Sequence, residues 1–191
     1  MSVACEKFQQ HFSGDRLRRL PGKVFSKRVP PDSCIRGRTS ASLYRAFGSA
    51  ILAHMQDGDI YKASGVIVVD RKVLVERSVN KEYFIHPGGK IEAGETPEQA
   101  VIRELKEELG ITVRQEDLLF FDENTAPAAH SPEVQVHMKV FIVRKWSGDI
   151  APASEVAEIR WLSSEVPQDI KVGSIMQHET IPKLKAEGII D

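Results

Sequence analysis

Short runs of apolar residues, spaced as in β-strands, follow one another along most of the chain after residue 62. Residues 63–70 (ASGVIVVD) and 71–78 (RKVLVERS) are rich in β-branched side chains, and the polar residues Asp70, Arg71 and Lys72 lie where they meet. Such runs bounded by turn residues favour strands, so these two segments predict a hairpin. The same kind of pattern predicts further strands at residues 82–86, 117–123, 134–146 and 156–162.

One segment between these strands has the period of an α-helix. Thr96 fits the N-cap, Pro97 fits the first helical position, and Gln99 completes a capping box with Thr96. Gly110 fits the left-handed residue that often ends a helix. The buried stripe of this helix is predicted to consist of Val101, Ile102, Leu105 and Leu109.

The order of these elements predicts the fold class. Strands on both sides of a single helix favour a mixed β-sheet with the helix packed against it, an α/β (α+β) architecture. A closing helix is predicted at residues 174–188, with Pro182 in its first turn or at a kink. We expect one domain over residues 59–191.

Residues 1–58 differ from this domain in charge and in pattern. Residues 1–56 hold ten Lys and Arg against three acidic residues, whereas the remaining residues hold 16 basic and 24 acidic ones. Three interpretations fit the basic segment. It is a flexible extension ahead of a working start near Met55, an organelle-targeting presequence, or an amphipathic helix with Leu43, Phe47 and Ile51 on one face.

The composition limits the classes of function. An acidic body disfavours a nucleic-acid groove, which needs clustered cations, and suits a protein that collects metal ions. The only two cysteines, Cys5 and Cys34, argue against a disulfide framework and fit a reducing compartment. No apolar stretch approaches the roughly 18 residues that a membrane span needs. We therefore expect a cytoplasmic protein, or an organellar one if the basic segment is a presequence, with no nucleic-acid or membrane partner. Monomer and homodimer both stay open.

Three glutamates crowd one face of the predicted helix. Glu104, Glu107 and Glu108 stand at spacings of i, i+3 and i+4. Like charges at such offsets weaken a helix by roughly 0.2–0.5 kcal/mol per pair, so something compensates them. One interpretation is a solvated acidic face that Arg103 and Lys106 balance.

The other interpretation is a divalent cation. Mg²⁺ and Mn²⁺ take oxygen ligands and commonly bridge to substrate phosphates. Pro87, Gly88 and Gly89 predict a tight turn where the backbone can approach a ligand closely, and the carbonyl of Gly88 could add a neutral ligand.

A longer pattern surrounds these glutamates. Gly89 and Glu95 are followed by the groups Arg103-Glu104-Leu105, Glu107-Glu108 and Gly110-Ile111 at fixed spacings. This pattern resembles the box of the Nudix hydrolase family at every specified position, and residues 87–112 are particularly similar to the MutT-type nucleoside triphosphate pyrophosphohydrolases. The resemblance extends over about residues 62–187. It implies a Nudix-type mixed sheet between helices and a metal-dependent hydrolysis of a nucleoside diphosphate linked to a group X. The expected substrate is a (d)NTP, normal or oxidised, which is cleaved to a nucleoside monophosphate and pyrophosphate.

The resemblance also implies roles for single residues. The proton of the attacking water is expected to go to Glu104, Glu107 or Glu155, and the choice among them stays open. Glu158 competes with Glu155 for the role of the acidic residue beyond the box. The implied metal ligands are Gly88, Glu104, Glu107, Glu108 and Glu155. The implied structural residues are Gly89, Glu95, Arg103 and Gly110, with an ion pair between Glu95 and Arg103.

The substrate is less well determined. Arg77 matches a phosphate-contacting position of the MutT-type enzymes, although an exposed Arg at a strand end is the plainer interpretation. Gln177 stands where those enzymes read a purine with an Asn, and Phe84 could pack beside a base or belong to the core. Pro127 matches a mark of ADP-ribose-hydrolysing relatives. The alternatives are therefore an ADP-ribose or nucleotide-sugar pyrophosphatase and a catalytically silent nucleotide-binding module.

We predict that residues 1–54 are not needed for catalysis, because no residue of the implied site lies among them. A chain that begins at Met55 should fold and hydrolyse nucleotides at the rate of the full-length chain. Circular dichroism and phosphate-release assays on both chains check this. Loss of all activity in a shortened chain that is still folded would contradict the prediction.

Overall fold

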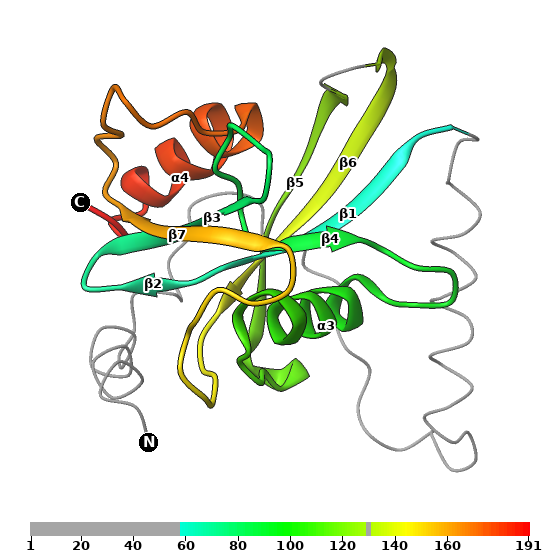
Figure 1. Ribbon diagram of the computed structural model, residues 1–191, viewed down its shortest axis with the longest axis horizontal. Helices are drawn as coiled ribbons and strands as arrows, with labels where there is room; N and C mark the ends of the chain where they lie inside the picture. Colours follow the sequence, from blue (N-terminus) through cyan, green and yellow to red (C-terminus); the bar gives the residue numbers. More distant parts are fainter. Residues whose placement is uncertain (1–57, 129–130) are drawn as a thin grey trace, which may run out of the picture.

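The structure is a computed structural model that describes residues 58–128 and 131–191 (Figure 1). The three interpretations of the basic segment concern residues that lie almost wholly outside these ranges. Within the described ranges, no helix is long and apolar enough to cross a membrane.

The strands of the described residues form two sheets. The larger sheet has the order β4-β1-β6-β5 and is mixed, because β1 and β6 are parallel while its other neighbouring strands are antiparallel. The smaller sheet, β2-β3-β7, is antiparallel. The bounds are β1 Ile60–Val66, β2 Val68–Val69, β3 Lys72–Ser78, β4 Gly88–Lys90, β5 Leu118–Ala128, β6 Ser131–Val143 and β7 Val156–Leu162.

The predicted first hairpin is present between β2 and β3. Asp70 and Arg71 have φ values of 47° and 60°, the left-handed conformation of a two-residue type I′ turn. The prediction missed a break at Ile67, where the pairing changes from β6 to β3. This break places β1 in one sheet and β2 in the other.

Two helices lie on opposite sides of the strands (Figure 1), and alternate residues of the strands belong to two different core clusters. Helix α3, Pro97–Leu109, packs on one side, where residues such as Ile67, Leu74 and Phe141 are buried with Leu105. Helix α4, Ile181–Ala186, packs on the other side with residues of the alternate register, among them Val66, Val73, Val75, Val140 and Ile142. The predicted mixed sheet between helices is therefore confirmed.

Helix α3 begins and ends at the predicted residues. The backbone N–H of Gln99 donates to the Thr96 hydroxyl at 3.3 Å, and the backbone N–H of Thr96 donates to the Gln99 side chain at 2.9 Å. Gly110 has a φ of 72°, and its N–H donates to the carbonyl of Lys106. Both caps are thus the ones that the sequence predicts.

Residues 82–90 differ from the prediction. Residues 82–86 form no strand and make only single bridges, between Phe84 and Val172 and between Ile85 and Glu76. The expected turn is instead the short strand β4, whose Gly88 pairs with Ser64 of β1. A Cβ on Gly88 would lie 2.6 Å from the Cα of Ser64, so only glycine allows this close pairing.

The hairpin of β5 and β6 is longer than predicted. The strands pair from Leu118 with Val143 to Ala128 with Ser131, and Figure 1 shows their paired ends projecting away from α3. Ser131 and Pro132 therefore lie in β6 and not in a loop. Backbone hydrogen bonds form this outer part, and its side chains are mostly polar or small, so the apolar pattern gave no signal there.

The predicted closing helix is present with one irregular turn. Residues Met176–Thr180 are π-helical, and the N–H of Ile181 donates to the carbonyl of Met176. Pro182 lies in the first turn of α4, as predicted, and it has no N–H to continue an α-helical hydrogen-bond series.

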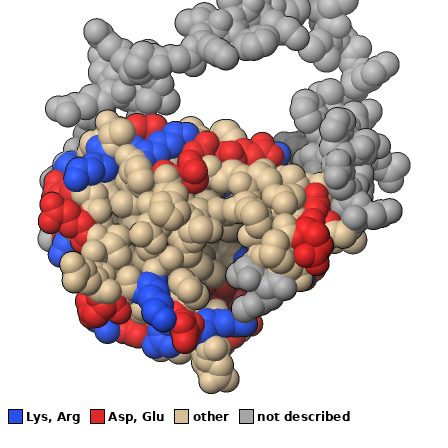
Figure 2. All heavy atoms as spheres, turned by 90° about the horizontal axis from the view of Figure 1, so that it is seen from above, with Lys and Arg blue, Asp and Glu red and all other residues tan. Residues whose placement is uncertain are grey.

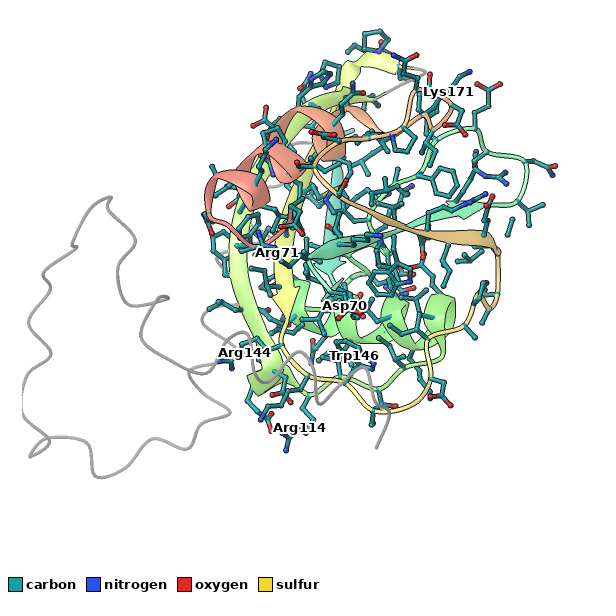
Figure 3. The ribbon with its side chains drawn as sticks, turned by 90° about the vertical axis from the view of Figure 1, so that its left-hand side faces the viewer. Asp70, Arg71, Arg114, Arg144, Trp146 and Lys171 are labelled. Carbon is teal, nitrogen blue, oxygen red and sulfur yellow. The ribbon has the colours of Figure 1, made fainter. Side chains whose placement is uncertain are left out.

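Arg71 joins the β2–β3 turn to the C-terminal residues. Its guanidinium pairs with the Asp191 carboxylate and donates to the carbonyls of Gly188 at 3.0 Å and Ile190 at 3.3 Å. The N–H of Asp191 returns a hydrogen bond to the Arg71 carbonyl at 3.1 Å. Figure 3 shows Asp70 and Arg71 at this turn.

We predict that Thr96→Ala lowers the free energy of unfolding by about 1 kcal/mol, because the N–H of Gln99 loses its capping acceptor. Urea unfolding followed by circular dichroism measures this. Thr112→Ala is the matched control, since Thr112 is exposed and its backbone bonds to Ser147 are kept; it should change stability by less than about 0.5 kcal/mol. Equal effects of the two substitutions would rule out the capping explanation.

Candidate active site

Two glutamates of α3 lie against the Gly88–Gly89 backbone. The Gly88 N–H donates to the Glu108 carboxylate at 2.7 Å, and Glu108 is buried. A Cβ on Gly89 would lie 2.0 Å from a carboxylate oxygen of Glu104. The two glycines therefore leave the space that these carboxylates fill, and they hold the last turns of α3 against β4.

A further carboxylate joins this site from the sheet. Glu76 of β3 is 1% exposed, and within the described residues no N–H or hydroxyl group donates to its oxygens, which contact the Glu108 carboxyl. Burial raises the pKa of Glu76, and the charges of Glu104 and Glu155 raise it further. Burial also raises the pKa of Glu108, followed by the neighbouring charge of Glu76. The two carboxyls thus form a buried acidic pair between β3 and α3.

Glu76 was not among the predicted site residues, although the sequence carries a signal for it. Leu74 and Glu76 share one face of the strand, because side chains two positions apart point the same way. Leu74 is fully buried against α3. A glutamate two residues after a core leucine is a carboxylate on the buried face, and such a group needs a partner.

Arg103 neutralises part of the acidic face. It donates to Glu95 at 3.0 Å and to Glu104 at 2.9 Å, and it reaches Glu107 at 3.4 Å. The implied Glu95–Arg103 ion pair is therefore present, and it lowers the pKa of Glu95. The arginine that was expected to balance the acids does so, whereas Lys106 donates to the Gly110 carbonyl.

The two candidates for the acidic residue beyond the box differ in their contacts. Glu158 forms an ion pair with Arg77 at 2.8 Å and a second ion pair with Arg160. Glu155 is exposed, and its charge acts on buried Glu76. Its backbone carbonyl accepts the N–H of Val79 at 2.9 Å, which holds this loop at the end of β3.

The three expected substrate-binding residues lie on different elements. Arg77 pairs with Glu158, donates to the Lys81 carbonyl at 3.2 Å and lies over the Phe84 ring at 5.5 Å. Phe84 is buried in the core on the α4 side. Gln177 is exposed on the π-helical turn.

Figure 2 shows a largely uncharged face that is hollowed near its middle, with acidic and basic side chains gathered around its rim. Small-molecule sites are concave and mostly apolar, and the uncharged hollow has this general form.

The donor set fits a hard divalent cation. Within residues 58–128 and 131–191, no group of three or more His, Cys, Asp or Glu side chains is arranged so that it could hold a metal ion. Carboxylate oxygens are nevertheless the donors that Mg²⁺ and Mn²⁺ prefer, and Glu76 presents two of them without an N–H or hydroxyl donor. Arg103 holds Glu104 and Glu107 toward itself, so a bound cation would have to draw these side chains away.

Comparison with known proteins agrees with this geometry. Residues 60–181 match the family described as NUDIX domain. The chain belongs to the NUDIX family.

Two curated relatives of this NUDIX chain differ in their substrates. The "8-oxo-dGTP diphosphatase" of Escherichia coli is 39% identical over 92 residues, 48% of this chain and 66% of that protein. The "ADP-ribose pyrophosphatase" of Methanocaldococcus jannaschii is 32% identical over 99 residues, 49% of this chain and 56% of that protein. The chain thus spans less than two thirds of the length of either relative.

A solved structure supports the fold. The MutT NUDIX hydrolase from Burkholderia pseudomallei has a TM-score of 0.53 and 22% sequence identity, over 66% of this chain and 96% of that one. At this identity the likeness establishes the architecture.

We predict that Glu76→Gln stabilises the metal-free protein more at about pH 8 than at about pH 5. The folded wild type holds the Glu76 proton above the ordinary pKa of 4.5, where the unfolded chain has released it. Stability from this group is therefore present below pH 4.5 and is lost as the pH rises. Urea unfolding in a metal chelator at several pH values measures the difference.

His86 contributes in the opposite direction, because burial lowers its pKa to about 4 and stability is lost as the pH falls below 6.5. Both proteins contain His86, so its contribution cancels in the comparison. A pH-independent difference between wild type and Glu76→Gln would contradict the prediction.

Proposed function

We propose that the domain hydrolyses a nucleoside diphosphate linked to a group X, with a divalent cation, and that a (d)NTP, normal or oxidised, is cleaved to a nucleoside monophosphate and pyrophosphate. The observation that carries this proposal is the seating of Glu104 and Glu108 on the Gly88–Gly89 backbone. The relative named 8-oxo-dGTP diphosphatase supports the class of substrate.

The residues that would hold the cation are the Gly88 carbonyl and the carboxylates of Glu104, Glu107, Glu108 and Glu155. Bound Mg²⁺ or Mn²⁺ would neutralise phosphate oxygens and lower the pKa of a bound water. Arg103 keeps Glu104 and Glu107 close together until the substrate arrives. Gly89 keeps the space beside Glu104 clear.

Glu107 is the best placed of the three proton acceptors that the family resemblance leaves open. Its side chain is 54% exposed and lies 3.4 Å from Arg103, whereas Glu104 is 15% exposed and is held by Arg103 at 2.9 Å. Glu107 can therefore turn toward a water more freely than Glu104. Glu155 is exposed as well and stays the second candidate.

Contacts to the substrate would come from residues that now have other partners. Arg77 could bind a substrate phosphate in place of Glu158, because a phosphate and a carboxylate are both anionic acceptors for a guanidinium. Gln177 offers a donor and an acceptor from its exposed position on the π-helical turn. A cytoplasmic location and a monomeric or homodimeric state remain part of the proposal.

ADP-ribose is the second candidate substrate, because the relative from Methanocaldococcus jannaschii is named for it. Both reactions break a phosphoric anhydride next to a nucleoside monophosphate, and they differ in the second product. A silent nucleotide-binding module is disfavoured, because every carboxylate of the box is present.

We predict that, with Mg²⁺, the protein releases pyrophosphate from a (d)NTP faster than it releases ribose phosphate from ADP-ribose. A panel of normal dNTPs, oxidised dGTP, ADP-ribose and dinucleoside polyphosphates, with chromatography of the products, measures this. Pyrophosphate and ribose phosphate identify the two reaction classes. No product from any substrate would exclude the hydrolase proposal.

The matched variants are Glu107→Gln and Glu98→Gln. Glu107→Gln should lower turnover by about 10²- to 10⁴-fold with the fold intact, as expected for a group that handles the proton or the cation. Glu98 lies in the first turn of the same helix, about half a turn around it from Glu107, and its replacement should leave turnover near the wild-type rate. Wild-type turnover in Glu107→Gln would favour the silent module.

A further inference from the structure

We propose that Glu76 is an additional carboxylate of the divalent-cation site, supplied by the sheet and facing the glutamates that α3 supplies. The pattern of the box does not include this residue. The proposal deepens the proposed function and rests on it.

The backbone fixes the position of Glu76. Its N–H donates to the Ile85 carbonyl at 2.9 Å, and its carbonyl accepts the N–H of Ile85 at 2.8 Å. Ile85 lies three residues before Gly88, whose N–H holds Glu108. Glu76 is therefore anchored beside the segment on which the glutamates of α3 are seated.

The side chain of Glu76 lacks the contacts that a purely structural glutamate would have. It is 1% exposed, and within the described ranges no N–H or hydroxyl group donates to either oxygen, so that its one hydrogen-bond contact is with the Glu108 carboxyl. In contrast, the Glu108 carboxylate accepts a hydrogen bond from a backbone N–H, and the Glu158 carboxylate forms ion pairs with two arginines. A buried carboxylate without donors is costly and is found where it binds a cation or shares a proton.

The neighbours of Glu76 point to a cation as the missing partner. Glu108 lies against it, and the charges of Glu104 and Glu155 reach it from α3 and from the loop before β7. Arg77 is adjacent in sequence but is held by Glu158. Lys62 is the cationic side chain whose charge reaches Glu76, and it makes no ion pair with Glu76.

The chemistry of the donors selects the ion. Glu76, Glu104, Glu108 and Glu155 offer only carboxylate oxygens, which suit Mg²⁺ and Mn²⁺. His86 is buried nearby, but its Nε2 lies 2.9 Å from the hydroxyl of Thr180 and is already bonded. We therefore choose Mn²⁺ as the probe, because it substitutes for Mg²⁺ in oxygen sites and is paramagnetic.

The test measures Mn²⁺ binding to the full chain without substrate at constant pH. Glu76→Gln should weaken Mn²⁺ binding by about tenfold or more in electron paramagnetic resonance titrations, as loss of a ligand or its support does. Water-proton relaxation should show more exchangeable water on the bound Mn²⁺, because water replaces the lost carboxylate. A merely structural role would leave this water count unchanged.

Two further variants frame the result. Glu123→Gln, at an exposed position of β5, should bind Mn²⁺ as the wild type does. Glu76→Asp keeps the charge on a shorter side chain and should bind Mn²⁺ more tightly than Glu76→Gln. The same order is expected for the rise in melting temperature that saturating Mn²⁺ produces.

The outcomes separate this inference from the proposed function. If the wild type binds Mn²⁺ and Glu76→Gln binds it with the same affinity and water count, the role of Glu76 is excluded while the proposed function stands. If Glu108→Gln and the wild type both fail to bind Mn²⁺, the cation-dependent function fails, and this inference fails with it.

Discussion

The burial of glutamate carboxyls beside the Gly88–Gly89 backbone is the constraint on which the rest of this domain depends. Glu76 and Glu108 are buried together, and Glu104 fills the space that Gly89 leaves open. Arg103 offsets the charge of the outer glutamates, but it does not reach the inner pair. A carboxylate pair of this kind is stable only with a proton or a cation between its members. The inner pair must therefore hold either a proton or a cation.

The arrangement of β3, β4 and α3 brings these glutamates together. Gly88 lets β4 lie directly against β1, and the N–H of Gly88 then meets the carboxylate of Glu108. The break at Ile67 sends the chain from the larger sheet into the smaller one, and this brings β3, with Glu76, under the end of α3. The caps at Thr96 and Gly110 fix where α3 begins and ends, and so they fix which of its turns faces the glycines. Glu104 and Glu108 are thus positioned by α3, and Glu76 is positioned by β3.

Family membership and architecture limit the chemistry more than they limit the substrate. A fold hosts many functions, and the substrate is selected by the particular residues of the site. Arg77 is paired with Glu158, Phe84 belongs to the core, and Gln177 is exposed. The residues that would bind a base and a phosphate therefore do not form a preassembled substrate site. The two curated relatives, which are named for different substrates, agree with this distinction between chemistry and substrate.

The sequence by itself determined the local features: the capping box at Thr96, the stop at Gly110, the β2–β3 turn and the spacing of the glutamates on α3. Each of these depends on residues that are near one another in the chain, so periodicity and turn chemistry reveal it. Tertiary structure alone decided that Gly88–Lys90 pairs as a strand and that β5 and β6 extend to Ala128 and Ser131. It also decided that Arg77 forms an ion pair with Glu158 and that Glu76 is buried against Glu108. The contacts of β4, Arg77 and Glu76 join residues between 24 and 81 positions apart, whereas the extension of β5 and β6 depends on backbone pairing, which most side chains allow. Sequence patterns record the face on which a residue lies, and only the packing of distant segments determines what that face meets.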